Sequence, residues 1–421
     1  MDDRTSINNP NKNRLIMYKW PLNISNFTWL DRLKICSFFL NPKNFWTMGN
    51  KVREFERRMA KFVDTKYAVF CSSGSTANTI LAMYLKDKCL KSKGNRQIVV
   101  LPSTTWATSV SPWIREGFTP HFIDISLDDF GMDLIKLDEY LLKNHEKVAA
   151  IFPTCLLGFN INFSNLISLK HKYPEIEFFV DNCENNFGGF DSFSFDAFRN
   201  HTSTTSTYFG HQLQSVEGGF IFTNKLEEYE KFLMYRNHGM TRSLNNLYNE
   251  LLVDNKYLNP QVDDRFDFNL SGNNFRNSDI HAFIGLLDLK RVYKYVRKRR
   301  KLYFSFFKNL NSDRYLLPQA ISSEHVPFCL PIICKGGTSL ERLKSIKQYC
   351  INNGIETRPI ISGFLGYQTA FKEYFSEYDR EHPRENYPNS VYLHDYGIYI
   401  GLHTKLKEKQ IIELTNFLNK I

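Results

Sequence analysis

The sequence lacks any uninterrupted apolar stretch long enough to cross a lipid bilayer. Its first ten residues, MDDRTSINNP, also lack the apolar core of a secretory signal peptide. Membrane-spanning and secreted proteins are therefore not expected, and we predict a cytoplasmic protein that makes no use of a membrane.

The sequence also has no Cys-x-x-Cys pair. Its eight cysteines are scattered along the chain, at positions 36, 71, 89, 155, 183, 329, 334 and 350. This pattern does not match a disulfide framework or a zinc site, and it is typical of reduced thiols in the cytosol. We therefore expect no metal site.

Lys and Arg are spread among Asp and Glu, so charge of one sign is not segregated. The net charge is +10. The densest basic cluster lies at residues 290–301, where Val292, Val296 and Leu302 have the spacing of the buried stripe of a helix. No nucleic-acid-binding motif accompanies it. We interpret the cluster as a solvated helix face and expect no nucleic-acid partner. The positive balance also suits a small substrate that carries a diphosphate.

Short apolar runs alternate with helical patterns in the first two thirds of the chain. Strands are expected at residues 67–71, 97–101, 120–125, 148–152, 176–180 and 220–223, and helices at 28–39, 51–62, 77–85, 226–235 and 279–296. This alternation predicts an α/β fold with a mostly parallel sheet and crossover helices. Residues 1–20 are expected to be frayed, and residues 243–268 to be irregular.

The last third of the chain has its own pattern. Strands are expected at residues 325–334 and 355–359. Amphipathic helices are expected between them, at 341–352, and after them, at 407–421. We predict an N-terminal lead-in at residues 1–44, a large domain at 45–290 and a small C-terminal domain at 291–421.

Polar residues stand directly after several of the expected strands, as Ser73–Ser75, Trp106, Asp181 and His211 do. Ligands of open α/β sheets gather at the carboxyl ends of the strands. The strand, Ser-Ser-Gly-Ser turn and helix around residue 74 also predict an anion site, because free backbone N–H groups and the helix dipole converge there.

The segment STYFGHQLQSVEGG at residues 206–219 contains His211 and no lysine, the next lysine being Lys225. Its two final glycines allow a sharp turn and a close approach to a ligand. The segment is the centre of the predicted site.

In their order along the chain, these motifs resemble those of the DegT/StrS-type sugar aminotransferase family, a fold-type I pyridoxal-phosphate group. The resemblance runs from about residue 45 to the C-terminus. Matching segments are FWTMG (45–49), VREFE (52–56), SGSTA (73–77), PSTTW (102–106), DNCE (181–184), EGG (217–219), RNHG (236–239), NFR (274–276) and ETRP (356–359). It implies a seven-stranded, mostly parallel sheet flanked by helices, with a smaller α+β C-terminal domain.

Aminotransferases of this family carry a cofactor-binding lysine six residues before the Glu-Gly-Gly or Asp-Gly-Gly, where this chain has His211. Histidine there marks the family's 3-dehydratases, which act on nucleotide-linked 4-keto-6-deoxyhexoses. Some of these bind an iron–sulfur cluster through four cysteines. Cys183 fits the first ligand, but residues 242–250 contain no cysteine. The resemblance therefore implies dehydration at C3 without a cluster.

The resemblance implies pyridoxal or pyridoxamine 5′-phosphate as the cofactor, a nucleotide sugar as the substrate and glutamate as the amino donor. It makes His211 the catalytic base, with His238 as a secondary candidate. The implied cofactor-binding residues are Gly74, Ser75, Trp106, Asp181, Glu184, Ser206 and Asn274.

The roles implied for these residues differ. Asp181 pairs with the pyridine nitrogen, Trp106 stacks on the ring, and Glu184 contacts the ring hydroxyl. Gly74, Ser75 and Ser206 bind the phosphate. Asn274 reaches the phosphate site of a neighbouring subunit, so a homodimer with shared active sites is expected.

Two departures affect the sugar side of the site. Gln212 stands where the dehydratases carry a second histidine, and residues 360–364 match the family only loosely. The nucleotide and the hexose therefore stay open, as does whether Arg276 and Arg358 meet the diphosphate or form salt bridges. Two alternatives are another reaction on a nucleotide sugar and a non-catalytic binding protein.

Overall fold

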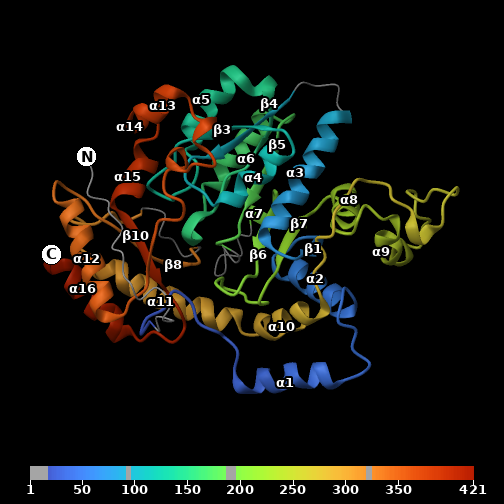
Figure 1. The fold of residues 1–421 in the computed structure, drawn as a ribbon, viewed down its shortest axis with the longest axis horizontal. Helices are drawn as coiled ribbons and strands as arrows, with labels where there is room; N and C mark the ends of the chain where they lie inside the picture. Colours follow the sequence, from blue (N-terminus) through green and yellow to red (C-terminus); the bar gives the residue numbers. More distant parts are fainter. Residues whose placement is uncertain (1–17, 92–95, 186–195, 319–324) are drawn as a thin grey trace.

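The computed structural model describes residues 18–91, 96–185, 196–318 and 325–421, which form two sheets and their covering helices (Figure 1). The large sheet has the strand order β1-β7-β6-β5-β4-β2-β3. Its strands are β1 (Tyr67–Cys71), β2 (Ile98–Pro102), β3 (Thr119–Ile123), β4 (Val148–Ile151), β5 (Glu177–Asp181), β6 (Thr202–Ser206) and β7 (Gly219–Thr223). Only β7 runs antiparallel to its neighbours β1 and β6. The predicted mostly parallel seven-stranded sheet is confirmed.

Strand β6 was not predicted from the sequence. Its residues are TSTTS, yet all five are buried between β5 and β7. Side-chain hydrogen bonds compensate for the burial of two of the hydroxyls: Thr204 donates to the Asn78 Oδ1 at 2.6 Å, and Thr202 donates to Glu228. A polar strand of this kind carries no apolar signal, so hydropathy cannot reveal it.

Helices cover both faces of the large sheet and surround the small one. In the first half of the chain they are α1 (Trp29–Leu40), α2 (Asn50–Phe62), α3 (Gly74–Lys91), α4 (Ser111–Arg115), α5 (Leu134–Asn144), α6 (Phe163–Lys172) and α7 (Asp196–Arg199). In the second half they are α8 (Leu226–Arg236), α9 (Asn245–Leu251), α10 (Asp279–Leu289), α11 (Val292–Asn309), α12 (Ser339–Asn353), α13 (Glu377–Glu381), α14 (Pro383–Asn386), α15 (Pro388–Tyr396) and α16 (Glu408–Lys420). Helix α3 begins three residues earlier than predicted, at Gly74 itself.

The predicted single helix at residues 279–296 is wrong. The chain breaks at Lys290 and Arg291 into α10 and α11, which run beneath both sheets in Figure 1. Arg291 leaves helical geometry (φ −121°, ψ −3°) while its guanidinium forms a 2.5 Å ion pair with Asp31.

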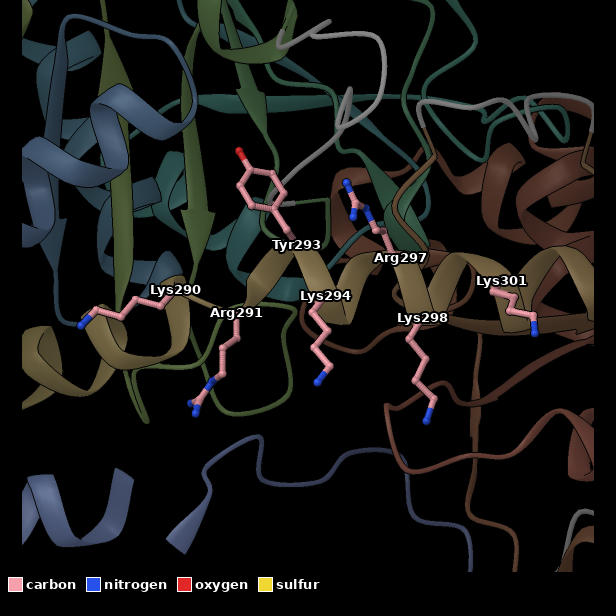
Figure 2. Close-up of a pocket in the computed structure, with 7 residues that line it drawn as sticks. All are labelled: Lys290, Arg291, Tyr293, Lys294, Arg297, Lys298 and Lys301. Carbon is pink, nitrogen blue, oxygen red and sulfur yellow. The ribbon is translucent and has the colours of Figure 1, made fainter. Parts of the chain in front are cut away.

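The basic stretch on α11 has the predicted buried stripe of Val292, Val296 and Leu302. Figure 2 shows Lys294 and Lys298 projecting from one side of the helix, along an open hollow of about 720 Å³. The interpretation as a solvated face is wrong for two of its arginines, because Arg299 and Arg300 are buried.

The small sheet is antiparallel, with the order β8-β10-β9. Its strands are β8 (Cys329–Ile333), β9 (Thr357–Pro359) and β10 (Gly397–Gly401). Together with α12 and α16 it forms the predicted α+β unit, although β10 was not predicted from the sequence. The proposed domain boundaries at residues 44 and 290 stay a prediction.

Two local predictions need correction. The chain is not frayed up to residue 20, because Trp20 is buried and its Nε1 donates to the Gly401 carbonyl at 2.9 Å; residues 1–17 lie outside the described part. The stretch 243–268 is not irregular throughout, since it contains α9 and a 3-10 turn at Asp264–Phe266.

None of the helices in the described ranges is both long and apolar enough to span a membrane.

Acid should destabilise the fold through His325, which is 1% exposed. Burial, with a smaller contribution from Arg300, lowers the pKa of His325 to about 3. The unfolded chain takes up this proton below about pH 6.5 and the folded chain does not, so stability is lost as the pH falls from about 6.5 towards 3. At pH 5 this one group costs about 2 kcal/mol. Urea unfolding at pH 7 and pH 5 should show a smaller acid loss in His325→Gln than in the wild type, whereas His382→Gln, at an exposed position, should match the wild type.

Candidate active site

One cavity of about 360 Å³ lies where the carboxyl ends of the parallel strands meet the small sheet. Its lining comprises Asn23, Ser73, Gly74, Ser75, Asn78, Trp106, Thr108, Ser109, Thr154, Leu156, Asp181, Cys183, Glu184, Ser206, Tyr208, Gly210, His211, Glu217, Phe328, Ile361 and Tyr399. The structure thus brings together seven of the nine residues predicted for the site. Parallel strands place their carboxyl ends at one edge of a sheet, which is why residues far apart in sequence meet here.

The N-terminus of α3 forms an anion cradle on the cavity wall. The helix is 18 residues long and begins at Gly74, so its free N–H groups and dipole favour a negative group. A Cβ at Gly74 would lie 2.8 Å from Cys183 Sγ and 3.0 Å from Ser206 Cβ, so only glycine leaves this space open. Ser75 Oγ is 2.8 Å from Thr108 Oγ1. A phosphate group fits this donor set.

Gly219, at the start of β7, packs directly against the turn that leads into α3. A Cβ there would overlap the backbone of Ser73 and Gly74. Because backbone atoms cannot move aside as a flexible side chain can, Gly219→Ala should destabilise the protein by about 3 kcal/mol. Thermal unfolding would measure this. Gly337→Ala is the matched control, because a Cβ at Gly337 meets nothing within 4 Å; equal melting temperatures for the two variants would contradict the prediction.

Asp181 presents a buried carboxylate at the end of β5. Its Oδ2 accepts hydrogen bonds from Ser109 Oγ at 2.6 Å and Asn78 Nδ2 at 3.0 Å, and its Oδ1 accepts one from the Cys183 N–H at 3.1 Å. Three donors hold the carboxylate in one orientation within the cavity. Such a fixed negative charge fits the protonated nitrogen of a pyridine ring.

His211 is half-buried, and its Nδ1 lies 2.6 Å from the Cys183 carbonyl oxygen. A carbonyl only accepts, so this contact assigns the proton to Nδ1 and leaves the Nε2 lone pair available. Burial, opposed by this hydrogen bond and assisted by Arg299, lowers the pKa of His211 to about 4. The imidazole is therefore neutral at pH 7, which is the state a general base requires.

Glu184 lines the same cavity as His211. Its Oε2 accepts a 2.7 Å hydrogen bond from the Leu157 N–H. Burial, opposed by that hydrogen bond and assisted by the Asp181 charge, raises the pKa of Glu184 to about 7. Leu157 adopts a left-handed conformation (φ 56°, ψ 15°) in making this contact, so the backbone is strained where it holds the carboxyl.

Trp106 follows β2 and leaves 58% of its surface exposed while lining the cavity. A tryptophan so exposed is not part of the core. Tyr208, 48% exposed, lines the same cavity and was not singled out in the sequence. Flat aromatic surfaces at the cavity fit a stacked ring.

His238 and Asn274 do not line the cavity of their own chain. The His238 N–H donates to the Asn273 carbonyl, and His238 has a positive φ of 59°. Asn274 is exposed, and its Oδ1 accepts from Arg276 Nε at 3.0 Å.

Gln212 and Arg358, which belong to the part of the site expected to face the sugar, both have partners within the chain. Gln212 is buried, and its Nε2 donates to the Glu184 carbonyl at 2.8 Å, so it braces the cavity wall from behind. Arg358 is half exposed and pairs with Glu356 at 2.8 Å.

Sequence reasoning missed the residues that hold the predicted ones in place. Asn78 and Ser109 orient Asp181, and Asn23 enters the cavity from the N-terminal segment. Asn78 offered one signal, since it is a polar residue on the buried face of α3, 1% exposed. Across the described ranges, no group of three or more His, Cys, Asp or Glu side chains is placed to hold a metal ion.

The chain is similar to known proteins over nearly its whole length. A family model described as DegT/DnrJ/EryC1/StrS aminotransferase family matches residues 39–419. The GDP-4-keto-6-deoxy-D-mannose 3-dehydratase of Yersinia pseudotuberculosis is 30% identical over 413 residues, which cover 97% of this chain and 100% of that relative.

Solved structures agree with these sequence similarities. The Escherichia coli GDP-4-keto-6-deoxy-D-mannose-3-dehydratase with bound hydrated PLP has a TM-score of 0.82 and 27% identity, covering 96% of this chain and 100% of that one. A GDP-4-keto-6-deoxymannose-3-dehydratase with a trapped PLP-glutamate geminal diamine has a TM-score of 0.81 and 28% identity, covering 95% and 100%.

Proposed function

The chain belongs to the DegT/DnrJ/EryC1/StrS aminotransferase family, and we propose that it removes the C3 hydroxyl of a nucleotide-linked 4-keto-6-deoxyhexose. It is a PLP-dependent lyase, and its cofactor alternates between pyridoxal and pyridoxamine 5′-phosphate. One observation carries this function: His211, a neutral base that cannot bond the cofactor covalently as lysine does, lies in the cavity with Asp181. The three dehydratases described above are each named for GDP-4-keto-6-deoxymannose, so this is the first substrate to test.

The cavity fits the cofactor at three points. When the cofactor binds, the N-terminus of α3 at Gly74 and Ser75, with Ser206 beside it, would hold the phosphate; Asp181 would pair with the protonated pyridine nitrogen, and Trp106 would stack on the ring. When bound, pyridoxamine phosphate supplies the amine that condenses with the C4 ketone and the ring that accepts electrons as the C3 hydroxyl leaves.

His211 moves the protons of this reaction through Nε2. Its Nδ1–H is held by the Cys183 carbonyl, so Nε2 is the atom that takes a proton from the cofactor's C4′ carbon and delivers it to the departing hydroxyl. An imidazole forms no Schiff base, so the amine stays available for the sugar. Glutamate then restores the amine, and the dehydrated enamine product hydrolyses to a 3-deoxy-4-keto sugar and ammonia.

A direct assay tests this function. The purified protein is loaded with PLP and incubated with glutamate and a panel of GDP-, CDP- and dTDP-linked 4-keto-6-deoxyhexoses. Release of 2-oxoglutarate and ammonia together with a 3-deoxy product would support the proposal. Formation of an amino sugar instead would identify an aminotransferase, and absence of PLP binding would leave only a non-catalytic role.

Two further aspects of the proposal concern the protein's setting. Asn274 is exposed and away from its own cavity, which supports the homodimer in which it reaches the partner's phosphate site. Cys71, Cys155, Cys329, Cys334 and Cys350 are buried free thiols, which supports a location in the reducing cytoplasm. Sedimentation velocity at several protein concentrations would test the dimer.

A further inference from the structure

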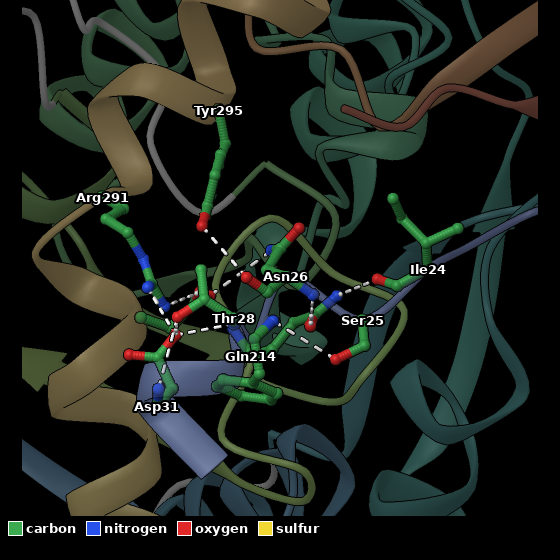
Figure 3. Close-up of polar contacts among 10 residues, drawn as sticks. Ile24, Ser25, Asn26, Thr28, Asp31, Gln214, Arg291 and Tyr295 are labelled. Carbon is green, nitrogen blue, oxygen red and sulfur yellow. Dashed lines mark hydrogen bonds and ion pairs between the residues drawn. The ribbon is translucent and has the colours of Figure 1, made fainter. Parts of the chain in front are cut away.

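The N-terminal segment before α1 lies across the loop that carries His211. Figure 3 shows Ile24 and Asn26 of this segment, and Asp31 in the first turn of α1, beside Gln214, Arg291 and Tyr295. About 190 residues of chain separate the two stretches. The segment from Trp20 to Asp31 is called the strap below.

The strap reaches the peptide that precedes His211. The Asn23 amide faces two carbonyl oxygens, and in the orientation that satisfies them its nitrogen donates to the Gly210 carbonyl at 2.9 Å and to the Leu22 carbonyl at 3.0 Å. Asn23 also lines the cavity together with Gly210 and His211. This hydrogen bond limits rotation of the Gly210–His211 peptide, and with it the direction in which the imidazole leaves the backbone.

The strap also holds the chain three residues after His211. Gln214 is 1% exposed; its Nε2 donates to the Ile24 carbonyl at 3.0 Å, and its Oε1 accepts from the Asn26 N–H at 3.2 Å. The Gln214 N–H donates to Asp288 Oδ2 at 2.9 Å, which ties the same position to α10. The Gln214 side chain therefore both donates to and accepts from the backbone of the strap.

Both ends of the strap are fixed to the body of the protein. At one end the Trp20 indole donates to Gly401, and the Leu22 N–H donates to Glu356 Oε2 at 3.0 Å. At the other end Asp31, 4% exposed, pairs with Arg291 at 2.5 Å, and Tyr295 donates to the Asn26 carbonyl at 3.2 Å. An element anchored at both ends can hold a loop in position.

We propose that the strap is a built-in positioning element for His211, and that Asn23 and Gln214 are its positioning residues. Asn23 fixes the peptide before the imidazole and Gln214 fixes the chain after it, while Cys183 orients the ring itself. The inference rests on the proposed role of His211 as the base, because a base displaced by about 1 Å loses much of its effect.

Two neutral variants of similar shape test the strap: Asn23→Leu removes the donor to Gly210, and Gln214→Met removes both contacts with the strap. Each should lower kcat for dehydration about 10-fold with KM little changed. Diethylpyrocarbonate acylates accessible imidazoles. In the cofactor-free form, it should modify His211 several-fold faster in each variant than in the wild type. Peptide mass spectrometry measures this rate, and exposed His382 of the same sample should keep its rate.

Asn353→Leu is the matched control, since this exposed amide also donates to a carbonyl, that of Tyr349, but on α12. An unchanged acylation rate of His211 in Asn23→Leu would overturn the proposal, even if kcat falls, because Asn23 would then act by touching the substrate. If Gln214→Met does not fold, the half-buried Asn23 position decides alone. A wild type without dehydratase activity would refute the proposed function, while the acylation rates would still report whether the strap holds His211.

Discussion

Replacing His211 by lysine should lower kcat for dehydration about 100- to 10,000-fold, the range that a positioned acid–base group contributes. Lysine at this position would bond the cofactor and compete with the sugar for it. Lysine would also lack the neutral Nε2 that the contact with the Cys183 carbonyl now directs, because its amine is protonated near neutral pH in water. Kinetics with saturating glutamate would measure the loss. Borohydride reduction followed by mass spectrometry should find cofactor on the chain in this variant and not in the wild type.

Two companions make this test specific. His211→Asn should lose dehydration to a similar extent without retaining cofactor on the chain, because an amide neither moves the proton nor bonds the cofactor. His171→Lys places the same change on the exposed face of α6 and should behave as the wild type. Undiminished dehydration in His211→Lys would rule out His211 as the base.

Replacing Asp181 by asparagine should lower kcat on the order of 100- to 1,000-fold, the cost of removing one preorganised electrostatic group. The carboxylate is 2% exposed and accepts three hydrogen bonds, so its charge is fixed in place. An amide of the same size keeps the packing but cannot hold the pyridine nitrogen protonated, and the ring then accepts electrons poorly. Its NH₂ would also face the donors Ser109 and Asn78.

The loss in Asp181→Asn should appear in both the dehydration and the glutamate reaction, because the cofactor ring serves both. Single-turnover absorbance of the bound cofactor with glutamate alone would separate them. Asp128→Asn, an exposed carboxylate, is the control. If Asp181→Asn slowed dehydration but not the glutamate reaction, Asp181 would be acting on the sugar and not on the ring.

Much of the site could be predicted from the order of motifs along the chain. Residues at the carboxyl ends of parallel strands must meet at one edge of the sheet, so Gly74, Trp106, Asp181 and His211 could be placed together from chain order alone. The exchange of lysine for histidine at position 211 is likewise a property of the sequence, read against the rest of the motif order.

The failures have a common physical cause. Local hydropathy reports which residues avoid water, but the buried β6 hydroxyls of Thr204 and Thr202 donate to the Asn78 amide and the Glu228 carboxylate, and neither this burial nor these partners are encoded within five residues. The break between α10 and α11 lies where Arg291 pairs with Asp31, some 260 residues away in the chain. Periodicity continues across that break because both halves keep their apolar stripes.

The tertiary structure alone decided how His211 is held. Its tautomer follows from the Cys183 carbonyl, 28 residues earlier, and its loop contacts the strap through the Asn23–Gly210 and Gln214–Ile24 hydrogen bonds, the latter joining residues 190 positions apart. Hydrogen bonds of this kind join groups by proximity and direction in space, which chain order does not specify. The motifs identified the chemical groups, and long-range contacts set their geometry: Asn78 and Ser109 at Asp181, and the strap at the loop of His211.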